Sequence, residues 1–294
     1  DRRNAALWQY YSEERRDRRM IIDAHQHFWQ LDRGDYGWLT PALAPLYRDF
    51  MPADLAPHLS RHGIDGTILV QAAPTLAETE FMLDLAERTP FVLGVVGWVD
   101  FEASSAADDI ARLARHPKLV GLRPMIQDIA DDDWMLRDDL SPAFEAMIKA
   151  NLTFDALVLP RHLSRLRELL SRHPNLRTVI DHAAKPAIAG GLFEDWAKDM
   201  AILAKETNAY CKLSGLLTEA GDDWTPTDVA PYVAHLMEHF GDQRLIWGSD
   251  WPVLTIATNY GTWVDMANSF IPNERESEAI FGSNAVDVYR LPSR

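Results

Sequence analysis

Eight short apolar runs alternate with amphipathic stretches from Met20 onward, and this alternation restricts the chain to very few architectures. Each run is rich in Val, Ile and Leu and is mostly apolar along its length. That pattern is typical of a strand buried on both faces of a parallel sheet. The predicted strands lie within residues 20–28, 64–73, 91–99, 119–126, 152–158, 176–183, 208–216 and 244–251.

The stretches between these runs predict helices. Pro52, Pro160 and Pro226 stand where they can open helices, because the first helical position needs no N–H donor. The predicted helices cover residues 76–88, 104–116, 141–151, 161–172, 192–207 and 227–240.

Eight strands with intervening helices match the (β/α)8 TIM barrel, an α/β fold of about 250 residues. We predict one such domain over residues 20–294, with an active-site loop at 29–51 that is long for a barrel connection and rich in aromatic residues. The competing interpretation is a doubly wound open sheet. That fold would carry a G-x-G-x-x-G loop after an early strand, and residues 63–66 (GIDG) lack this spacing.

Residues 1–19 differ in character from the rest of the chain. They contain six arginines and four acidic residues, a net charge of +2, so the remainder carries −17 of the total −15. They also lack the apolar core of a secretory signal. We predict that they are an N-terminal extension outside the fold, ahead of a natural start at Met20.

Composition narrows the classes of partner. A net charge of −15 argues against nucleic acid and against an anionic membrane surface, since both need a basic patch. No apolar run approaches the ~20 residues of a membrane helix. The one cysteine, Cys211, cannot form an internal disulfide or a thiolate metal cluster, and we expect it to pack within a strand. We predict a cytoplasmic protein that acts on a small molecule, with homo-oligomer formation left open.

Polar residues gather at the predicted strand ends. The carboxyl ends of the strands form the active face of a (β/α)8 barrel, so we expect these side chains to converge on one mouth. In chain order, the ends hold His25, Gln26, His27, Gln71, Asp100, Arg123, Asp155, Asp181, His182, Lys212, Ser214 and Asp250.

Three of these positions suggest chemistry directly, each with an alternative. His25 and His27 are two residues apart on a strand and project to the same face, where they can hold a metal or a polarised carbonyl; otherwise they bond to backbone. Asp250, at the end of the last strand, can deprotonate a water, or it caps a helix. His182 can bind a substrate oxygen or a metal, or it anchors a loop.

The segments Asp23-Ala24-His25-Gln26-His27-Phe28-Trp29, Asp181-His182-Ala183-Ala184-Lys185-Pro186 and Trp247-Gly248-Ser249-Asp250-Trp251-Pro252 together resemble the amidohydrolase superfamily. More narrowly, they resemble its branch of sugar-lactone hydrolases, which includes L-fuconolactonases and L-rhamnonolactonases. The likeness runs in the same order over residues 20–292. It implies a barrel whose active face is lined by the histidine pair, His182 and Asp250.

The sequence also departs from the binuclear members of that superfamily. Those members place a lysine carbamate or glutamate on the fourth strand and a histidine on the fifth, whereas this chain has Arg123 and Asp155 there. An arginine cannot ligate a cation. The resemblance therefore implies either one zinc ion, held by His25, His27, Asp250 and His182, or no metal at all. No organic cofactor is expected.

The mechanism implied by these residues is hydrolysis of a lactone ester. Attack of water on the carbonyl needs a base and positive charge for the developing oxyanion. Asp250 is the predicted base, while His25 and His27, with or without Zn²⁺, and Arg123 polarise the carbonyl. The alternative for Arg123 is an ion pair with a barrel acid.

Further residues are predicted to contact the sugar. His182, Lys185 and Tyr36 would meet its hydroxyl groups. Trp29, Trp38 and Trp251 would lie against its apolar face, the alternative for each being core packing. Core packing is the expectation for Trp196, Trp247 and Trp263.

Two other functional classes compete with the lactonase. One is a zinc-dependent decarboxylase of an aromatic or unsaturated acid, which would require a tightly held metal. The other is a non-catalytic sugar-binding barrel, which would be indifferent to loss of the Asp250 carboxylate.

Overall fold

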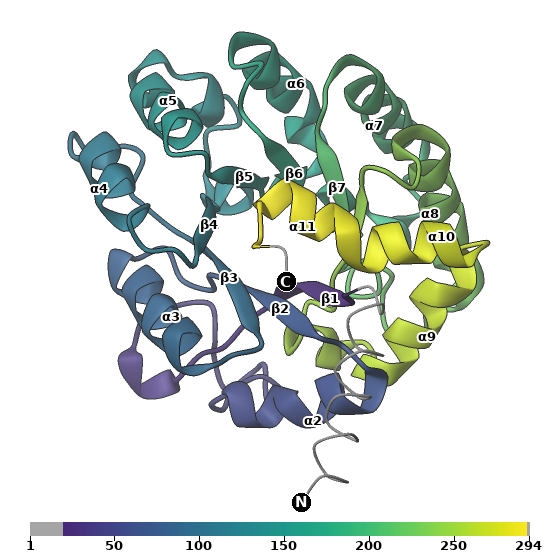
Figure 1. The fold of residues 1–294 in the computed structure, drawn as a ribbon. Helices are drawn as coiled ribbons and strands as arrows, with labels where there is room; N and C mark the ends of the chain where they lie inside the picture. Colours follow the sequence, from purple (N-terminus) through teal and green to yellow (C-terminus); the bar gives the residue numbers. More distant parts are fainter. Residues whose placement is uncertain (1–19, 293–294) are drawn as a thin grey trace, which may run out of the picture.

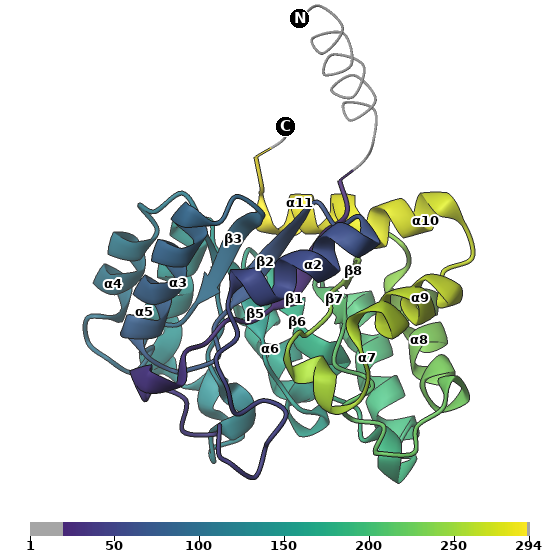
Figure 2. The ribbon, with the colours of Figure 1, turned by 90° about the horizontal axis from the view of Figure 1, so that it is seen from below.

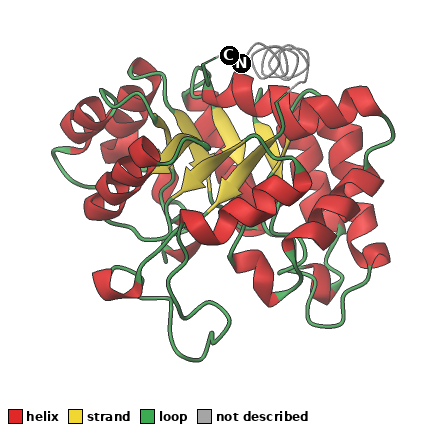
Figure 3. Cartoon of the chain, turned by 60° about the horizontal axis from the view of Figure 1, so that its bottom comes forward, coloured by secondary structure: helices red, strands yellow, loops and turns green. Residues whose placement is uncertain are grey.

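A computed structural model describes residues 20–292 and confirms the single (β/α)8 barrel. Eight strands form one sheet in the order β1 to β8, and every neighbouring pair is parallel. Helices surround the sheet as an outer layer (Figures 1 and 3). The predicted extension at residues 1–19 lies outside the described residues.

The barrel is built from short strands and longer helices. The strands are β1 Ile22–Gln26, β2 Gly66–Val70, β3 Val92–Gly97, β4 Leu119–Leu122, β5 Thr153–Ala156, β6 Thr178–Ile180, β7 Tyr210–Leu213 and β8 Leu245–Trp247. The helices are α2 Pro52–His62, α3 Leu76–Arg88, α4 Ala106–Leu113, α5 Ser141–Lys149, α6 Leu163–Arg172, α7 Glu194–Glu206, α8 Pro226–Phe240, α9 Tyr260–Phe270, α10 Glu274–Glu278 and α11 Asn284–Tyr289.

Each predicted apolar run contains one strand, and each strand is shorter than its run. The six predicted helices correspond to α3 through α8. Pro52 and Pro226 occupy the first positions of α2 and α8, and Pro160 opens the short 3-10 turn η5 (Pro160–His162) before α6. Helices α9, α10 and α11 follow the last strand and were not predicted.

The barrel closes between β1 and the segment after β8. The Asp250 amide donates to the His25 carbonyl at 2.8 Å, and the His27 amide donates to the Trp251 carbonyl at 2.8 Å. The buried Asp23 carboxylate reinforces this seam by accepting from the Ser249 amide and hydroxyl. Burial raises the pKa of Asp23 to about 6, although these hydrogen bonds oppose the rise. The seam fixes Asp250 next to the two histidines of β1.

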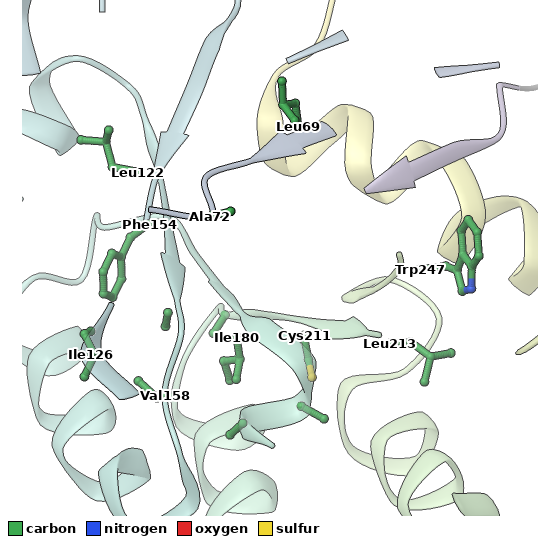
Figure 4. Close-up of a cluster of buried hydrophobic side chains, with 14 of the residues drawn as sticks. Leu69, Ala72, Leu122, Ile126, Phe154, Val158, Ile180, Cys211, Leu213 and Trp247 are labelled. Atoms are coloured by element: carbon green, nitrogen blue, oxygen red, sulfur yellow. The ribbon is translucent and has the colours of Figure 1, made fainter. Parts of the chain in front are cut away.

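Two apolar clusters pack on opposite sides of the sheet. The larger one lies between the strands and the helices, and Figure 4 shows part of it, including Leu69, Phe154 and Cys211. The smaller one fills the interior at the amino ends of the strands, where Ile68, Val179 and Ile246 meet residues of α11. Helix α11 therefore closes one end of the barrel (Figure 1).

The loop 29–51 lies at the other end of the barrel from α11 (Figure 2). Its ends are joined by backbone hydrogen bonds between Trp29 and Phe50, and side chains anchor the rest of it. The Tyr36 hydroxyl donates to Glu78 Oε2 at 2.8 Å, and the Trp38 indole donates to the Ala72 carbonyl at 2.8 Å. The Trp29 indole donates to the Arg48 carbonyl within the loop, also at 2.8 Å. These contacts hold the loop over the carboxyl ends of the first strands.

Among residues 20–292, no helix has both the length and the apolar content needed to cross a membrane.

Candidate active site

Four side chains from three parts of the chain converge at the carboxyl ends of the strands. His25 Nε2 lies 3.2 Å from His27 Nε2 and 3.6 Å from Asp250 Oδ1. His27 Nε2 is 3.2 Å and His182 Nε2 is 3.9 Å from the same carboxylate oxygen. All four residues are at most 4% exposed. The predicted histidine pair, His182 and Asp250 thus form one centre.

A register irregularity in β1 makes the histidine pair compatible with the core. Ile22 and Ala24 belong to the interior apolar cluster, so strict alternation would turn His25 and His27 away from the interior. The pairing of β1 with β2 shifts between Asp23 and Gln26. The shift lets even-numbered apolar residues and odd-numbered histidines both face inward.

Asp250 is held as a carboxylate. Burial by itself raises its pKa, but the nearby His182, His27 and His25 outweigh burial and bring the pKa far below its ordinary value. Its backbone has a φ of 60°, and its amide is tied to the His25 carbonyl. An ionised carboxylate is the state that both a base and a metal ligand require.

His27 and His182 are oriented through their Nδ1 atoms. His27 Nδ1 lies 2.7 Å from the Val70 carbonyl, which can only accept, so Nδ1 carries the proton and Nε2 faces the centre. His182 Nδ1 pairs with the Ser214 hydroxyl at 2.8 Å. Burial lowers the pKa of His182 to about 4, against the pull of Asp250 and Asp181, so its imidazole is neutral near pH 7.

His182 stands on an unusual turn. The 3-10 segment η6 (Asp181–Ala184) is followed by Lys185, and residues 182–185 all have positive φ. Gly215 packs directly against the imidazole: a Cβ there would lie 2.6 Å from His182 Nδ1. No regular helix or strand repeat encodes such a turn.

Arg123 lies against the centre and forms the ion pair with a barrel acid that was the alternative for it. Its Nη1 lies 3.4 Å from His25 Nε2 and 3.4 Å from Asp181 Oδ2, so it faces the centre and also pairs with a barrel acid. Its Nη2 donates to the Gln71 carbonyl, and Gln71 in turn donates to the Arg123 carbonyl at 2.8 Å. The guanidinium is thereby clamped at the edge of the centre.

A buried charged network below the centre was not assigned a role from the sequence. Lys212 Nζ lies 2.5 Å from Asp155 Oδ2, 3.0 Å from Asp181 Oδ1 and 3.1 Å from His25 Nδ1. The Tyr289 hydroxyl of α11 donates to Asp155 Oδ2 at 2.7 Å. The available signal was a lysine inside the apolar strand Tyr-Cys-Lys-Leu, because lysine is almost never fully buried unless it is paired.

The remaining predicted site residues differ in their exposure and in their contacts. Trp38 is 37% exposed and stands beside Trp29, with ring centroids 5.4 Å apart. Lys185 is partly exposed and pairs with Glu219 at 3.6 Å. The Tyr36 hydroxyl is engaged by Glu78. Trp251 is 2% exposed and packs against Phe28, Phe50 and His58.

Three tryptophans and the cysteine have the packing roles predicted for them. Trp196, Trp247 and Trp263 are each at most 2% exposed, and Trp247 stacks on Phe281. Burial raises the pKa of the Cys211 thiol, which excludes a thiolate nucleophile at neutral pH.

The donor set at the centre fits one zinc ion. Two imidazole nitrogens and one carboxylate oxygen are ligand types that zinc takes, and their spacings of 3.2–3.6 Å suit atoms surrounding one small cation. His25, His27 and Asp250 are the residues that would hold it, while His182 approaches Asp250 at 3.9 Å and groups with His25 and Asp181. Arg123 cannot ligate a cation, and Asp155 is paired with Lys212, so neither residue supplies a ligand for a second ion.

A (β/α)8 barrel with one histidine near the end of β1 and a second just after it, a histidine after β6 and an aspartate after β8 defines a hydrolase type of site. The chain belongs to the amidohydrolase family: the family profile described as "Amidohydrolase" matches residues 22–291.

Relatives match this chain over nearly their full length. An L-fucono-1,5-lactonase from Burkholderia ambifaria is 49% identical, covering 92% of this chain and 95% of the relative. An L-fucono-1,5-lactonase from Burkholderia multivorans is 34% identical, covering 92% and 96%. A crystal structure of an amidohydrolase from Burkholderia multivorans with bound zinc superposes with a TM-score of 0.87, at 33% identity, covering 93% of this chain and all of the other.

Proposed function

We propose that this protein hydrolyses a sugar lactone, opening the ester of an L-fucono-1,5-lactone type of substrate to the aldonic acid. The observation that carries the proposal is the buried Asp250 carboxylate, flanked by three imidazoles, one of which, His25, is in contact with Arg123. The relatives at 49% and 34% identity support the substrate class. The same relatives support the decarboxylase alternative less than the lactonase.

Asp250 would be the general base. It orients a water toward the lactone carbonyl and takes one proton as the water oxygen bonds to the carbonyl carbon. His27 Nε2, 3.2 Å from Asp250 Oδ1, is placed to share that proton.

Arg123 and His25 would stabilise the oxyanion that forms on the carbonyl oxygen. A guanidinium stays charged at any working pH, and preorganised donors in a water-poor site cost no reorganisation during the reaction. A bound zinc ion would add Lewis-acid polarisation of the same carbonyl. The ring C–O bond then breaks, and the departing ring oxygen receives the proton held at Asp250.

The mouth of the barrel would recognise the sugar. We assign hydroxyl recognition to His182 and Lys185, and we assign the apolar face of the sugar to the exposed ring of Trp38. Trp29 and Tyr36 would act on the substrate through the loop 29–51, since their polar atoms already bond to Arg48 and Glu78.

A pH-indicator assay of acid release from a panel of aldonolactones tests the proposal. We expect release from L-fucono-1,5-lactone well above the rate of an enzyme-free blank, which corrects for spontaneous opening. Parallel arms with chelator and with added zinc measure the metal dependence. Acid release from none of the aldonolactones, or carbon dioxide release from an aromatic acid, would reject the lactonase.

A further inference from the structure

The Lys212 ammonium contacts Nδ1 of His25, on the other side of the ring from the Nε2 atom that faces His27 and Asp250. Lys212 lies on β7 and is fully buried, and its Nζ is 3.1 Å from His25 Nδ1. An ammonium has three donors and no acceptor, so this contact requires a lone pair on Nδ1. With a lone pair on Nδ1, the imidazole ring is neutral and its one proton is on Nε2.

We infer that Lys212 is a positioning residue that fixes His25 in the tautomer with its proton on Nε2. In that tautomer, His25 presents an N–H donor to the centre of the site. The inference deepens the proposed function, since such a donor is what a lactone carbonyl oxygen needs as it gains negative charge.

The other neighbours of His25 are consistent with this assignment. Asp181 Oδ1 is 3.6 Å from Nδ1, too far to accept a hydrogen bond in competition with Lys212 at 3.1 Å. Arg123 Nη1 lies 3.4 Å from Nε2, but Asp181 Oδ2 is an equally near acceptor for that guanidinium. His27 Nε2 at 3.2 Å and Asp250 Oδ1 at 3.6 Å are the atoms that the Nε2 proton faces.

Lys212 is itself held in place from the closed end of the barrel. Asp155 Oδ2 accepts from Lys212 and from the Tyr289 hydroxyl, and Asp181 completes the charge balance. The chain of contacts therefore runs from α11 through Asp155 and Lys212 to His25. Each link is buried, so no water competes for the lone pair on Nδ1.

The same contact acts against metal binding at His25. A metal-ligating histidine usually donates its second N–H to a carboxylate or carbonyl, which leaves the other nitrogen free for the ion. His27 follows that rule through Val70, whereas His25 has an ammonium at the corresponding position. A zinc ion at His25 Nε2 must displace the proton that Lys212 places there, so Lys212 lowers the zinc affinity of the centre.

Two variants isolate Lys212. Lys212→Met alone would leave the buried carboxylates of Asp155 and Asp181 without their lysine partner. We therefore combine it with Asp155→Asn, so that the double variant loses one positive and one negative charge. The single variant Asp155→Asn is the matched control, since it alters the network but leaves Lys212 against His25.

The first readout is the nitrogen-15 NMR spectrum of histidine-labelled protein, which separates protonated from unprotonated ring nitrogens. The His25 signals are assigned by their loss in His25→Gln. We expect the proton on Nε2 in the wild type and in Asp155→Asn, and transfer to Nδ1 in the double variant. A wild-type His25 with its proton on Nδ1 overturns the inference without any Lys212 variant having to fold.

The second readout is zinc affinity, measured by competition with a fluorescent chelator. We expect the double variant to bind zinc at least about tenfold more tightly than Asp155→Asn, the size of effect that outer contacts of ligating histidines have. Equal or weaker binding overturns the inference. Neither readout uses a lactone, so both outcomes are independent of whether the proposed hydrolysis is observed.

Discussion

At the scale of single residues, the environment of each site group determines its chemistry more than its identity does. Asp23 and Asp250 are both buried aspartates within one seam. Burial dominates at Asp23 and raises its pKa to about 6, whereas the surrounding histidines dominate at Asp250 and lower its pKa. Asp23 therefore serves as a structural tie, and Asp250 remains an ionised carboxylate.

Asp250→Asn should lower lactone turnover by about 10²–10⁴-fold, the usual contribution of a positioned general base. The amide keeps the size of the side chain, and the backbone contact with His25 is unaffected. Initial rates over a range of lactone concentrations measure the effect, and thermal unfolding checks the fold. A folded Asp250→Asn protein with unchanged turnover would remove Asp250 from the mechanism.

At the scale of elements, the sequence predicted the strands and the site they carry because both follow simple periodicity. Apolar runs locate β1 to β8, and the residues that end those runs include His25, Arg123 and Asp250. Helices α9 to α11 were missed because they lie after the last run, where no further strand brackets them. Their amphipathic signal had no repeating unit to support it.

Two features of the site could not be predicted from the periodicity of the sequence. The irregularity in β1 depends on its register with β2, a contact between residues distant in sequence. The left-handed turn at His182 depends on tertiary contacts with Gly215 and Ser214. The paired role of Lys212 was missed for the same reason, since its partners come from β1, β5 and the end of β6.

Gly215→Ala tests the contact between the end of β7 and the His182 turn. Its φ of 64° disfavours any side chain, and its Cβ would lie 2.6 Å from His182 Nδ1. We expect a loss of turnover by tenfold or more together with a lower thermal midpoint. Kinetics and thermal unfolding of the variant measure the two effects.

Gly191→Ala is the matched control, because Gly191 has the same φ of 64° and a Cβ added there would meet no atom within 4 Å. Its variant carries the backbone cost without the collision. Equal losses of turnover in both variants would show that Gly215 acts only through its backbone conformation.

At the scale of the whole molecule, buried acids tie the long loop to the barrel and make its stability depend on pH. Burial raises the pKa of Glu78 to about 7, although the hydrogen bonds from Tyr36 and Ala72 oppose the rise. In the unfolded chain the same group titrates at its ordinary value of 4.5. Between these values the folded protein binds the extra proton, so the contribution of Glu78 to stability falls as pH rises.

Glu78→Gln should isolate this effect. From about pH 4.5 to 7, the free energy of unfolding of the wild type should fall relative to that of the variant by at most about 1.4 kcal/mol per pH unit. Urea unfolding at several pH values measures the difference. The exposed Glu194→Gln is the control and should show no such trend; a flat difference for Glu78→Gln would contradict the prediction.

The closure of one barrel end by α11 has a practical consequence for handling the enzyme. The described chain begins and ends on the α11 side, and the loop 29–51 lies at the opposite end of the barrel (Figure 2). A tether joined at either end would therefore leave the substrate entrance facing solution, which suits immobilisation on a solid support. Shortening the chain past Tyr289 would remove the hydroxyl that secures Asp155, so the tether must be added beyond that residue.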